Sequence, residues 1–150
     1  MTDRDTLRID RAKPADAELL ADLNRELDED EPHPYPVSQP ARLERMTRWI
    51  ETGEYGVLLF RRGQRVAGYA VWRMEEYGAF LRQFFICRDQ RREGLGRAAM
   101  ALLCRDVFPK DRPLHLEAAM WNQKAIDFWH ALGFQDFGLS MELKAGQAVK

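Results

Sequence analysis

The sequence predicts an α/β fold of the mixed α+β kind, in which helices pack against the faces of one central sheet. Three observations lead to this prediction. Short apolar runs of strand length alternate along the chain with longer segments of helical period. In the first half, strand-like runs are joined by tight turns, which indicates antiparallel hairpins; in the second half, helices separate the strands. Neither a repeat nor a low-complexity linker interrupts this order, so we expect one domain spanning residues 1–150.

The chain begins with a predicted strand and two predicted helices. Residues 7–9 alternate apolar and polar side chains, and residues 14–27 repeat leucines at helical spacing. The following stretch, residues 28–40, contains four consecutive acidic residues and four prolines, so we expect an exposed loop. Ser38 is a suitable N-cap for the second helix, and Gly53 is its expected end.

The rest of the chain supplies the remainder of the sheet and two further helices. We expect about six to seven strands and about four helices in all. In chain order, the later elements are strands at 56–60, 66–72 and 79–87, a helix at 95–103, a strand at 114–118, a helix at 122–132, and a closing strand at 134–143.

Composition and charge exclude several classes of protein. With 45% hydrophobic and 31% charged residues, the chain should be globular, and it lacks both a membrane-spanning run and the apolar core of a secretory signal. We therefore expect a cytoplasmic protein that does not bind membranes. A net charge of −1 gives no general attraction for nucleic acid. Cys87 and Cys104 have no neighbours at metal-ligand spacing, so we expect free thiols and no metal site.

One loop combines glycines with a cluster of arginines. Gly94 and Gly96 lie where the strand at 79–87 is followed by a helix, and the arginines around them are Arg88, Arg91, Arg92 and Arg97. Unpaired amides at a helix N-terminus, the helix dipole and guanidinium groups together favour a phosphate or pyrophosphate ligand.

A nucleotide cofactor of the NAD type is one alternative for this loop. Gly94, Gly96 and Ala99 match the dinucleotide pattern G-x-G-x-x-G/A, and Glu117 ends the next predicted strand about 20 residues later. That pattern normally follows its strand directly, whereas a long basic segment intervenes here. An NAD-binding domain therefore remains a remote alternative.

Two segments carry a family resemblance. The sequence RREGLG, residues 91–96, resembles the R/Q-x-x-G-x-G/A motif with which the GCN5-related N-acetyltransferase (GNAT) family binds the pyrophosphate of acetyl-CoA. The sequence NQKAIDFWHALGF, residues 122–134, resembles the second motif of that family, and the likeness covers about residues 80–135. The resemblance implies a mostly antiparallel sheet whose two central strands splay apart, with acetyl-CoA as the acyl-donor cosubstrate.

The resemblance also implies where coenzyme A binds. Its pantetheine arm would lie along the strand backbone of Phe85, Ile86 and Cys87, and a backbone amide near Phe85 would polarise the thioester carbonyl. The implied coenzyme A contacts are Phe85, Ile86, Cys87, Arg91, Arg92, Glu93, Gly94, Leu95, Gly96, Arg97, Asn122, Ala125 and Phe128.

The residues for proton transfer are less well defined. Many relatives have a tyrosine general acid where this sequence has Trp129, whose indole has no usable acidity. Candidate catalytic residues are Glu75, Glu76, Glu117 and Tyr77.

The expected reaction is direct transfer of an acetyl group to an amine of a small molecule or peptide within a ternary complex. The acidic stretch Asp28, Glu29, Asp30 and Glu31, with Tyr35, is expected to bind a cationic acceptor. The absence of a general acid at Trp129 leaves a second alternative, a non-catalytic acyl-CoA-binding module. Exposed strand edges would also allow a homodimer.

Overall fold

A computed structural model describes residues 6–91 and 93–150. The chain divides into two compact units, unit 1 at Met1–Glu117 and unit 2 at Ala118–Lys150. Unit 1 contains every strand of the described residues together with helices α1, α2 and α3, and unit 2 contains α4. The expectation of one domain over residues 1–150 stays a prediction.

Two helices follow the first strand. The short 3₁₀ turn η1 (Pro14–Asp16) leads into α1 (Ala17–Asp30), and α2 (Gln39–Thr52) begins after Ser38, whose hydroxyl accepts a hydrogen bond from the Ala41 amide at 3.3 Å. This contact confirms Ser38 as the N-cap of α2. The prediction that a loop begins at residue 28 is wrong, because α1 continues to Asp30. Arginines from other elements neutralise the carboxylates of this last helical turn, which would otherwise repel one another.

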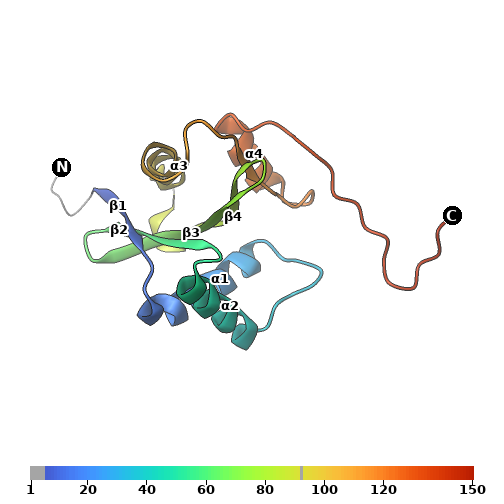
Figure 1. The fold of residues 1–150 in the computed structure, drawn as a ribbon, viewed down its shortest axis with the longest axis horizontal. Coiled ribbons are helices and arrows are strands. Elements are labelled where there is room, and N and C mark those ends of the chain that lie inside the picture. Colours follow the sequence, from blue (N-terminus) through green and yellow to red (C-terminus); the bar gives the residue numbers. More distant parts are fainter. Residues whose placement is uncertain (1–5, 92) are drawn as a thin grey trace. The chain divides into compact units, whose positions relative to one another are not determined.

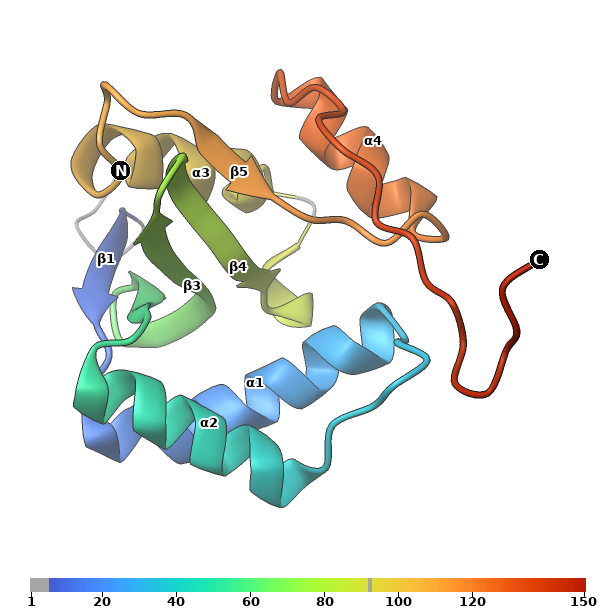
Figure 2. The ribbon, with the colours of Figure 1, turned by 45° about the vertical axis from the view of Figure 1, so that its right-hand side comes forward.

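The sheet has five strands among the described residues, fewer than the six to seven expected. Their order is β1-β2-β3-β4-β5, and the neighbouring strands are antiparallel except for the parallel pair β4–β5 (Figures 1 and 2). The strands are β1 (Leu7–Arg11), β2 (Gly56–Arg62), β3 (Arg65–Glu75), β4 (Gly78–Ile86) and β5 (Leu114–Leu116).

The two strands β4 and β5 pair along only part of β4. Pairing runs from Ala79 opposite Leu114 to Leu81 opposite Leu116, whereas β4 itself continues to Ile86. Beyond Leu81, β4 is paired with β3 alone. The resemblance implied a splay between two central strands; among the described residues β5 is the edge strand of the sheet, and it leaves β4 beyond Leu81.

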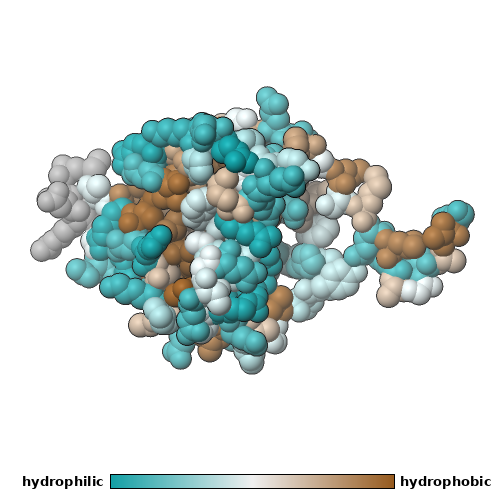
Figure 3. Space-filling model, in the orientation of Figure 1, coloured by the Kyte–Doolittle hydropathy of each residue, from teal (hydrophilic) through white to brown (hydrophobic). Residues whose placement is uncertain are grey.

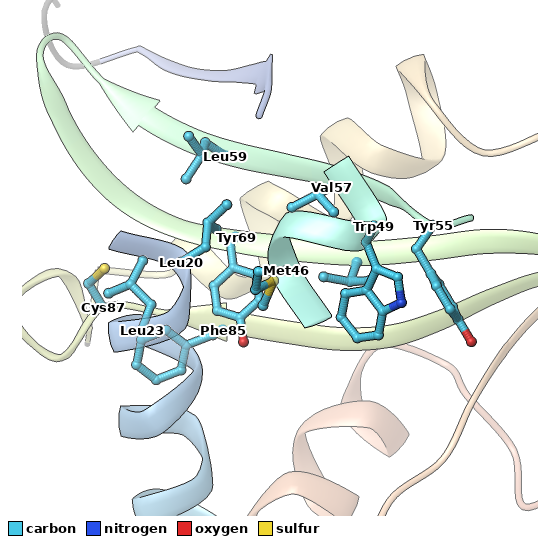
Figure 4. Packing of buried hydrophobic residues seen from close by; sticks show 11 residues of the cluster. Leu20, Leu23, Met46, Trp49, Tyr55, Val57, Leu59, Tyr69, Phe85 and Cys87 are labelled. Atoms are coloured by element: carbon cyan, nitrogen blue, oxygen red, sulfur yellow. The ribbon is translucent and has the colours of Figure 1, made fainter. Parts of the chain in front are cut away.

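Helices cover both faces of the sheet. On one face, α1 and α2 contribute Leu20, Met46 and Trp49 to a buried cluster that includes Tyr69 and Phe85 of the sheet (Figure 4). Successive strand residues point to opposite faces, so the neighbours of these residues form a second layer.

The second layer lies against α3 (Leu95–Asp106), on the opposite side of the sheet from α1 and α2 (Figure 1). The rings of Phe60 and Phe84 meet there at 5.7 Å, and those of Trp72 and Phe108 at 5.2 Å. Both layers bury their apolar side chains, and hydrophilic residues occupy most of the face shown in Figure 3. Within residues 6–91 and 93–150, none of the helices has the length and apolar character needed to cross a bilayer.

Unit 2 consists of α4 (Gln123–Ala131) followed by an irregular segment. The predicted strand at 134–143 is wrong, since these residues have no regular secondary structure. Phe137, Leu139 and Met141 alternate as in a strand but are 86%, 62% and 84% exposed. An alternating pattern forms a strand only where a partner accepts its backbone hydrogen bonds, and the described part of unit 2 contains no other strand.

Candidate functional site

The loop between β4 and α3 ends in an open helix N-terminus. Gly94 is the N-cap of α3 and has φ of 71°, a left-handed conformation that favours glycine. The first helical hydrogen bond runs from the Ala98 amide to the Gly94 carbonyl at 3.1 Å. The amides of Leu95 and Gly96 precede this bond and have no helical acceptor. This end of α3 therefore presents backbone donors, with positive dipole potential, to an anion.

Arginines from the β2–β3 hairpin fix the other side of the loop. Arg62 donates to the side chain of Gln90 at 3.1 Å and pairs with Glu93 at 2.6 Å. Arg65 pairs with Asp89 at 3.1 Å, and Gln90 is buried. Because Arg62 holds the Glu93 carboxylate, the negative charge of Glu93 is partly neutralised, which favours an incoming phosphate.

Two arginines expected to bind phosphate are paired with the end of α1. Arg88 lies 3.4 Å from Glu26, 3.1 Å from Glu29 and 3.1 Å from Asp30. Arg91 pairs with Asp30 at 2.6 Å. Although partial burial alone would raise the pKa of Asp30, hydrogen bonds from Arg91 and Arg88 lower it below its usual value.

The remaining arginines predicted to bind phosphate are Arg92 and Arg97. Arg97 lies exposed in the first turn of α3. Arg92 lies outside the described residues. Arg91 additionally donates from Nε to the Ile86 carbonyl at 2.9 Å, which ties the loop to the end of β4.

The hydrogen-bonding pattern between β3 and β4 identifies the backbone groups of β4 that face away from β3. The Cys87 amide donates to the Ala67 carbonyl at 2.8 Å, and Phe85 lies opposite Tyr69. Since the groups of an antiparallel strand alternate in direction, those of Phe85 point to β3, and those of Phe84 and Ile86 point to the other side. The Ile86 carbonyl that accepts from Arg91 agrees with this assignment.

The side chains of Phe85 and Cys87 belong to the apolar core of unit 1. Burial raises the pKa of the Cys87 thiol to about 11, so this cysteine is neutral at physiological pH and is a poor nucleophile. The side chains of Phe85 and Cys87 are therefore not available to a ligand.

The predicted catalytic residues are not gathered at the loop. Glu75 pairs with Arg73 at 3.1 Å, and Tyr77 is 75% exposed in the turn before β4. This turn, which also contains Glu76, is separated from the loop by the nine residues of β4, roughly 30 Å at the usual strand rise. Glu117 is exposed just after β5. The structure does not bring these four residues together with the start of α3.

The acidic residues expected to bind the acceptor are engaged within unit 1. Asp28 pairs with the buried Arg42 at 2.8 Å, and Asp30 pairs with Arg91 as described above. Glu31 is the C-cap of α1, and the exposed Tyr35 donates its amide to His33 Nδ1 at 2.9 Å. The arginine partners reduce the negative potential that these carboxylates would offer a cationic ligand.

Sequence reasoning missed a cluster on the α2 face of the sheet. We call it the arginine–aromatic cluster: Arg45 and Trp49 of α2, Tyr55 before β2, and Arg82 of β4. Arg45 and Arg82 both lie over the Trp49 ring, at 5.0 and 5.1 Å from its centroid. The available indications were Arg45 next to the apolar positions of α2, and Arg82 in a strand that is apolar apart from Arg82 and Gln83.

In unit 2, the Asn122 side chain accepts a hydrogen bond from the Ala125 amide at 3.2 Å and so caps α4. Trp129 packs against Phe128 at 4.8 Å and against Phe134 at 5.3 Å, between ring centroids. Asn122 thus has a structural role in starting the helix, and Trp129 belongs to an aromatic group within unit 2. Among the residues that the structure describes, no group of three or more potential ligands could hold a metal ion.

Comparison with known proteins gives a consistent result. Residues 20–134 match the profile of the Acetyltransferase (GNAT) family. A search of curated proteins found no match.

Several solved structures share the fold. An acetyltransferase from Thermus thermophilus is 22% identical with a TM-score of 0.70, and the match covers 87% of each chain. A predicted acetyltransferase from Clostridium acetobutylicum, solved with acetyl-CoA, is 12% identical with a TM-score of 0.69, over 93% of this chain and 96% of that one. The aminoglycoside N-acetyltransferase AAC(6')-Iy in complex with CoA is 15% identical with a TM-score of 0.71, over 94% and 95%.

Proposed function

Because the chain belongs to the GNAT acetyltransferase family, we propose that it transfers an acetyl group from acetyl-CoA to an amine of a small molecule or peptide. One observation carries the proposal: the loop after β4 leads to the open N-terminus of α3, and β5 leaves the outer edge of β4 unpaired beyond Leu81. Coenzyme A carries a diphosphate with an extended arm attached to it. The N-terminus of α3 would hold the diphosphate, and the unpaired edge of β4 would hold the arm.

The residues at the start of α3 fit a diphosphate. A Cβ atom built at Gly94 would meet no atom within 4 Å, so this side of the helix end is open. The Leu95 and Gly96 amides would donate to phosphate oxygens, and the Arg97 side chain would add positive charge. Asn122, Ala125 and Phe128 stay as contacts that the family resemblance implies.

The outer edge of β4 fits the pantetheine arm. Phe84 and Ile86 direct their backbone groups to this edge, so the arm would lie beside them like an added strand. Acetyl-CoA supplies the reactive thioester, and an amide of this edge would donate to the thioester carbonyl as negative charge develops on its oxygen.

Proton transfer does not require three of the four candidates, Glu75, Glu76 and Tyr77. Glu75, Glu76 and Tyr77 lie at the far end of β4, and a neutral acceptor amine can release its proton to water as it attacks. Since Trp129 offers no acidic proton, the departing thiolate would take its proton from water. We retain Glu117, which follows β5, as the candidate base acting through water.

Trp129 favours a second candidate, a non-catalytic acyl-CoA-binding module of the same fold. It occupies the position at which many relatives have a tyrosine acid, and it is packed between two phenylalanine rings. The NAD-binding alternative is weaker because that fingerprint belongs to a parallel sheet, and three of the four strand pairings here are antiparallel.

A thermal melt with acetyl-CoA, desulfo-CoA, NAD or ATP tests the proposal. A ligand at about 100 times its dissociation constant stabilises the folded state by about 2.7 kcal/mol, which corresponds to a midpoint shift of about 5 °C or more. We expect such a shift with the two coenzyme A compounds and none with NAD. A midpoint shift with NAD alone would contradict the proposal. The absence of a shift with any of the four ligands would also contradict it.

Turnover then separates the enzyme from the binding module. Both would be stabilised by acetyl-CoA, but only the enzyme releases free coenzyme A thiol in proportion to added amine. Stabilisation without thiol release across a broad amine panel would favour the binding module.

A further inference from the structure

Two guanidinium groups of unit 1 have no carboxylate partner. Arg45 donates to the Asn24 side-chain oxygen at 2.9 Å, and Arg82 donates to the Tyr55 hydroxyl at 2.9 Å. Within residues 6–91 and 93–150, neither arginine forms an ion pair. Nearby arginines do: Arg48 pairs with Glu54 at 3.3 Å, and Arg73 pairs with Glu75 at 3.1 Å. Arg45 and Arg82 thus lack the direct ion pair that these two neighbouring arginines have.

Aromatic rings hold these two positive charges close together. Both guanidinium groups lie over Trp49, and Arg82 also lies 5.2 Å from the centre of the Tyr55 ring. Burial lowers the pKa of Arg45 and the neighbouring charge of Arg82 lowers it further, while the charge of Asp28 offsets part of this effect. Cation–π contacts offset part of this repulsion. A bound anion would offset the remaining repulsion between the two guanidinium groups.

The cluster also contains more hydrogen-bond donors than acceptors. Arg45 Nε and the indole Nε1 of Trp49 are buried and have no acceptor, and Trp49 is 1% exposed. Figure 4 shows Trp49 and Tyr55 side by side, with the indole nitrogen on the side of Trp49 that faces Tyr55. Buried polar groups normally find partners, so a donor-rich cluster indicates that an acceptor is missing from the protein itself.

The position of Arg82 links the cluster to the proposed acetyl-CoA edge. Val71 lies opposite Gln83 and Trp72 lies opposite Leu81, so Arg82 is the extra residue of a β-bulge. It follows the last residue of β4 that pairs with β5, and it precedes the edge at Phe84 and Ile86. Bulges redirect side chains, and this one directs Arg82 onto the aromatic rings of the α2 face.

We propose that Arg45 and Arg82 bind a carboxylate of the acceptor, so that the preferred acceptor is an amine that also carries a carboxylate, such as an amino acid. This inference rests on the proposed acetyltransferase function. A guanidinium group matches a carboxylate through paired hydrogen bonds, and Trp49 and Tyr55 hold the two guanidinium groups in place. The preference is opposite to the cationic acceptor expected from the acidic stretch at residues 28–31.

The first experiment compares matched acceptors. Each amino acid is tested against its α-carboxamide, with spermidine as a cationic amine, by measuring free thiol release from acetyl-CoA. We expect kcat/KM to be about 10- to 100-fold higher for the carboxylates, the range that one charge-assisted paired contact supplies. Equal rates for acid and amide, or a preference for spermidine, would overturn the proposal and leave acetyl transfer established.

Variants test whether the arginine–aromatic cluster causes the preference for a carboxylate. In Arg82→Gln, the advantage of acid over amide should fall at least tenfold, mainly through a higher KM for the acid. Arg45→Lys, which keeps the charge but loses the planar fork, should give a smaller loss. Arg48→Gln is the matched control on α2, because Arg48 is exposed and paired with Glu54. An unchanged ratio in Arg82→Gln would overturn the proposal.

Binding without turnover gives an independent measurement. Thermal melts of the whole protein with an amino acid or its carboxamide should show a larger midpoint shift for the acid in the wild type, and equal shifts in Arg82→Gln. If acetyl-CoA fails to shift the midpoint but this difference remains, the proposed function fails and the anion site stands. Equal shifts in the wild type would overturn the anion site.

Discussion

Asp30 competes with phosphate for the arginines of the loop. It pairs with Arg91 at 2.6 Å and with Arg88 at 3.1 Å. The variant Asp30→Asn removes one negative charge near the proposed diphosphate, which at about 6 Å in water is worth roughly 0.7 kcal/mol. We therefore expect the dissociation constant for acetyl-CoA to fall about threefold, measured by calorimetric titration. A weaker affinity would show that Asp30 orients these arginines for the ligand instead.

The same carboxylate predicts a pH dependence of stability. Because the pKa of Asp30 is lower in the folded state, its contribution is present above its unfolded pKa of about 3.9, and is lost as pH falls through the folded value. At pH 7 we expect Asp30→Asn to lower the free energy of unfolding by about 0.5–1 kcal/mol. The difference should shrink as the pH falls below the unfolded pKa and vanish once Asp30 is protonated in the folded state, as urea titrations at several pH values would reveal.

Glu44→Gln is the control for this titration. Glu44 is an exposed residue of α2 and has no hydrogen bond or ion pair within the described residues. Its replacement should change stability little at any pH. If Glu44→Gln and Asp30→Asn behave alike, the arginine contacts of Asp30 contribute nothing measurable.

The start of α3 depends on the conformation of Gly94. Alanine in this left-handed conformation costs about 1 kcal/mol, and a Cβ atom would meet no neighbour within 4 Å. The added methyl group would, however, stand beside the amides proposed to hold the diphosphate. We expect Gly94→Ala to lower acetyl-CoA affinity about tenfold, the loss of one hydrogen bond to a charged group, measured by calorimetric titration.

Gly53→Ala provides a matched control for this variant. Gly53 ends α2 with φ of 72°, and a Cβ atom there would also meet nothing within 4 Å. Both variants should lose about 1 kcal/mol of stability, but only Gly94→Ala should lose affinity. Equal affinities would remove α3 from the proposed diphosphate site.

The individual elements show what the sequence could predict. Local signals placed the caps of α2 at Ser38 and Gly53, because these depend on the side chains present there. The extent of α1 could not be predicted in this way, since its last turn depends on Arg88 and Arg91, about 60 positions later in the chain. The strand predicted at 134–143 failed for the same reason, because alternation alone does not supply a pairing partner.

The candidate site also contains features that depend on local sequence and features that depend on tertiary contacts. The backbone features near Gly94 follow from a local motif, so sequence reasoning found them. The arginine–aromatic cluster joins Arg45 of α2 to Arg82 of β4, and only the fold brings these residues together. Partner choice among charged side chains is a tertiary property, which is why the acidic residues at 28–31 resembled a free binding surface in the sequence.

The division of the molecule into two units leads to the last prediction. Unit 1 contains all five described strands and the apolar core, whereas α4 of unit 2 has nine residues, none of them buried. Helices shorter than about 12–15 residues are marginal in water without tertiary packing. By circular dichroism, we expect the fragment 1–117 to unfold cooperatively and the peptide 118–150 to show little helix.

Calorimetry of the whole chain completes this test. If residues 1–150 form one domain, the full chain should melt in a single transition whose calorimetric and van't Hoff enthalpies agree. The midpoint should lie above that of the fragment 1–117, because unit 2 would then add to the same cooperative structure. A peptide 118–150 that folds alone, or a full chain that melts at the same midpoint as the fragment, would show that the two units are energetically independent.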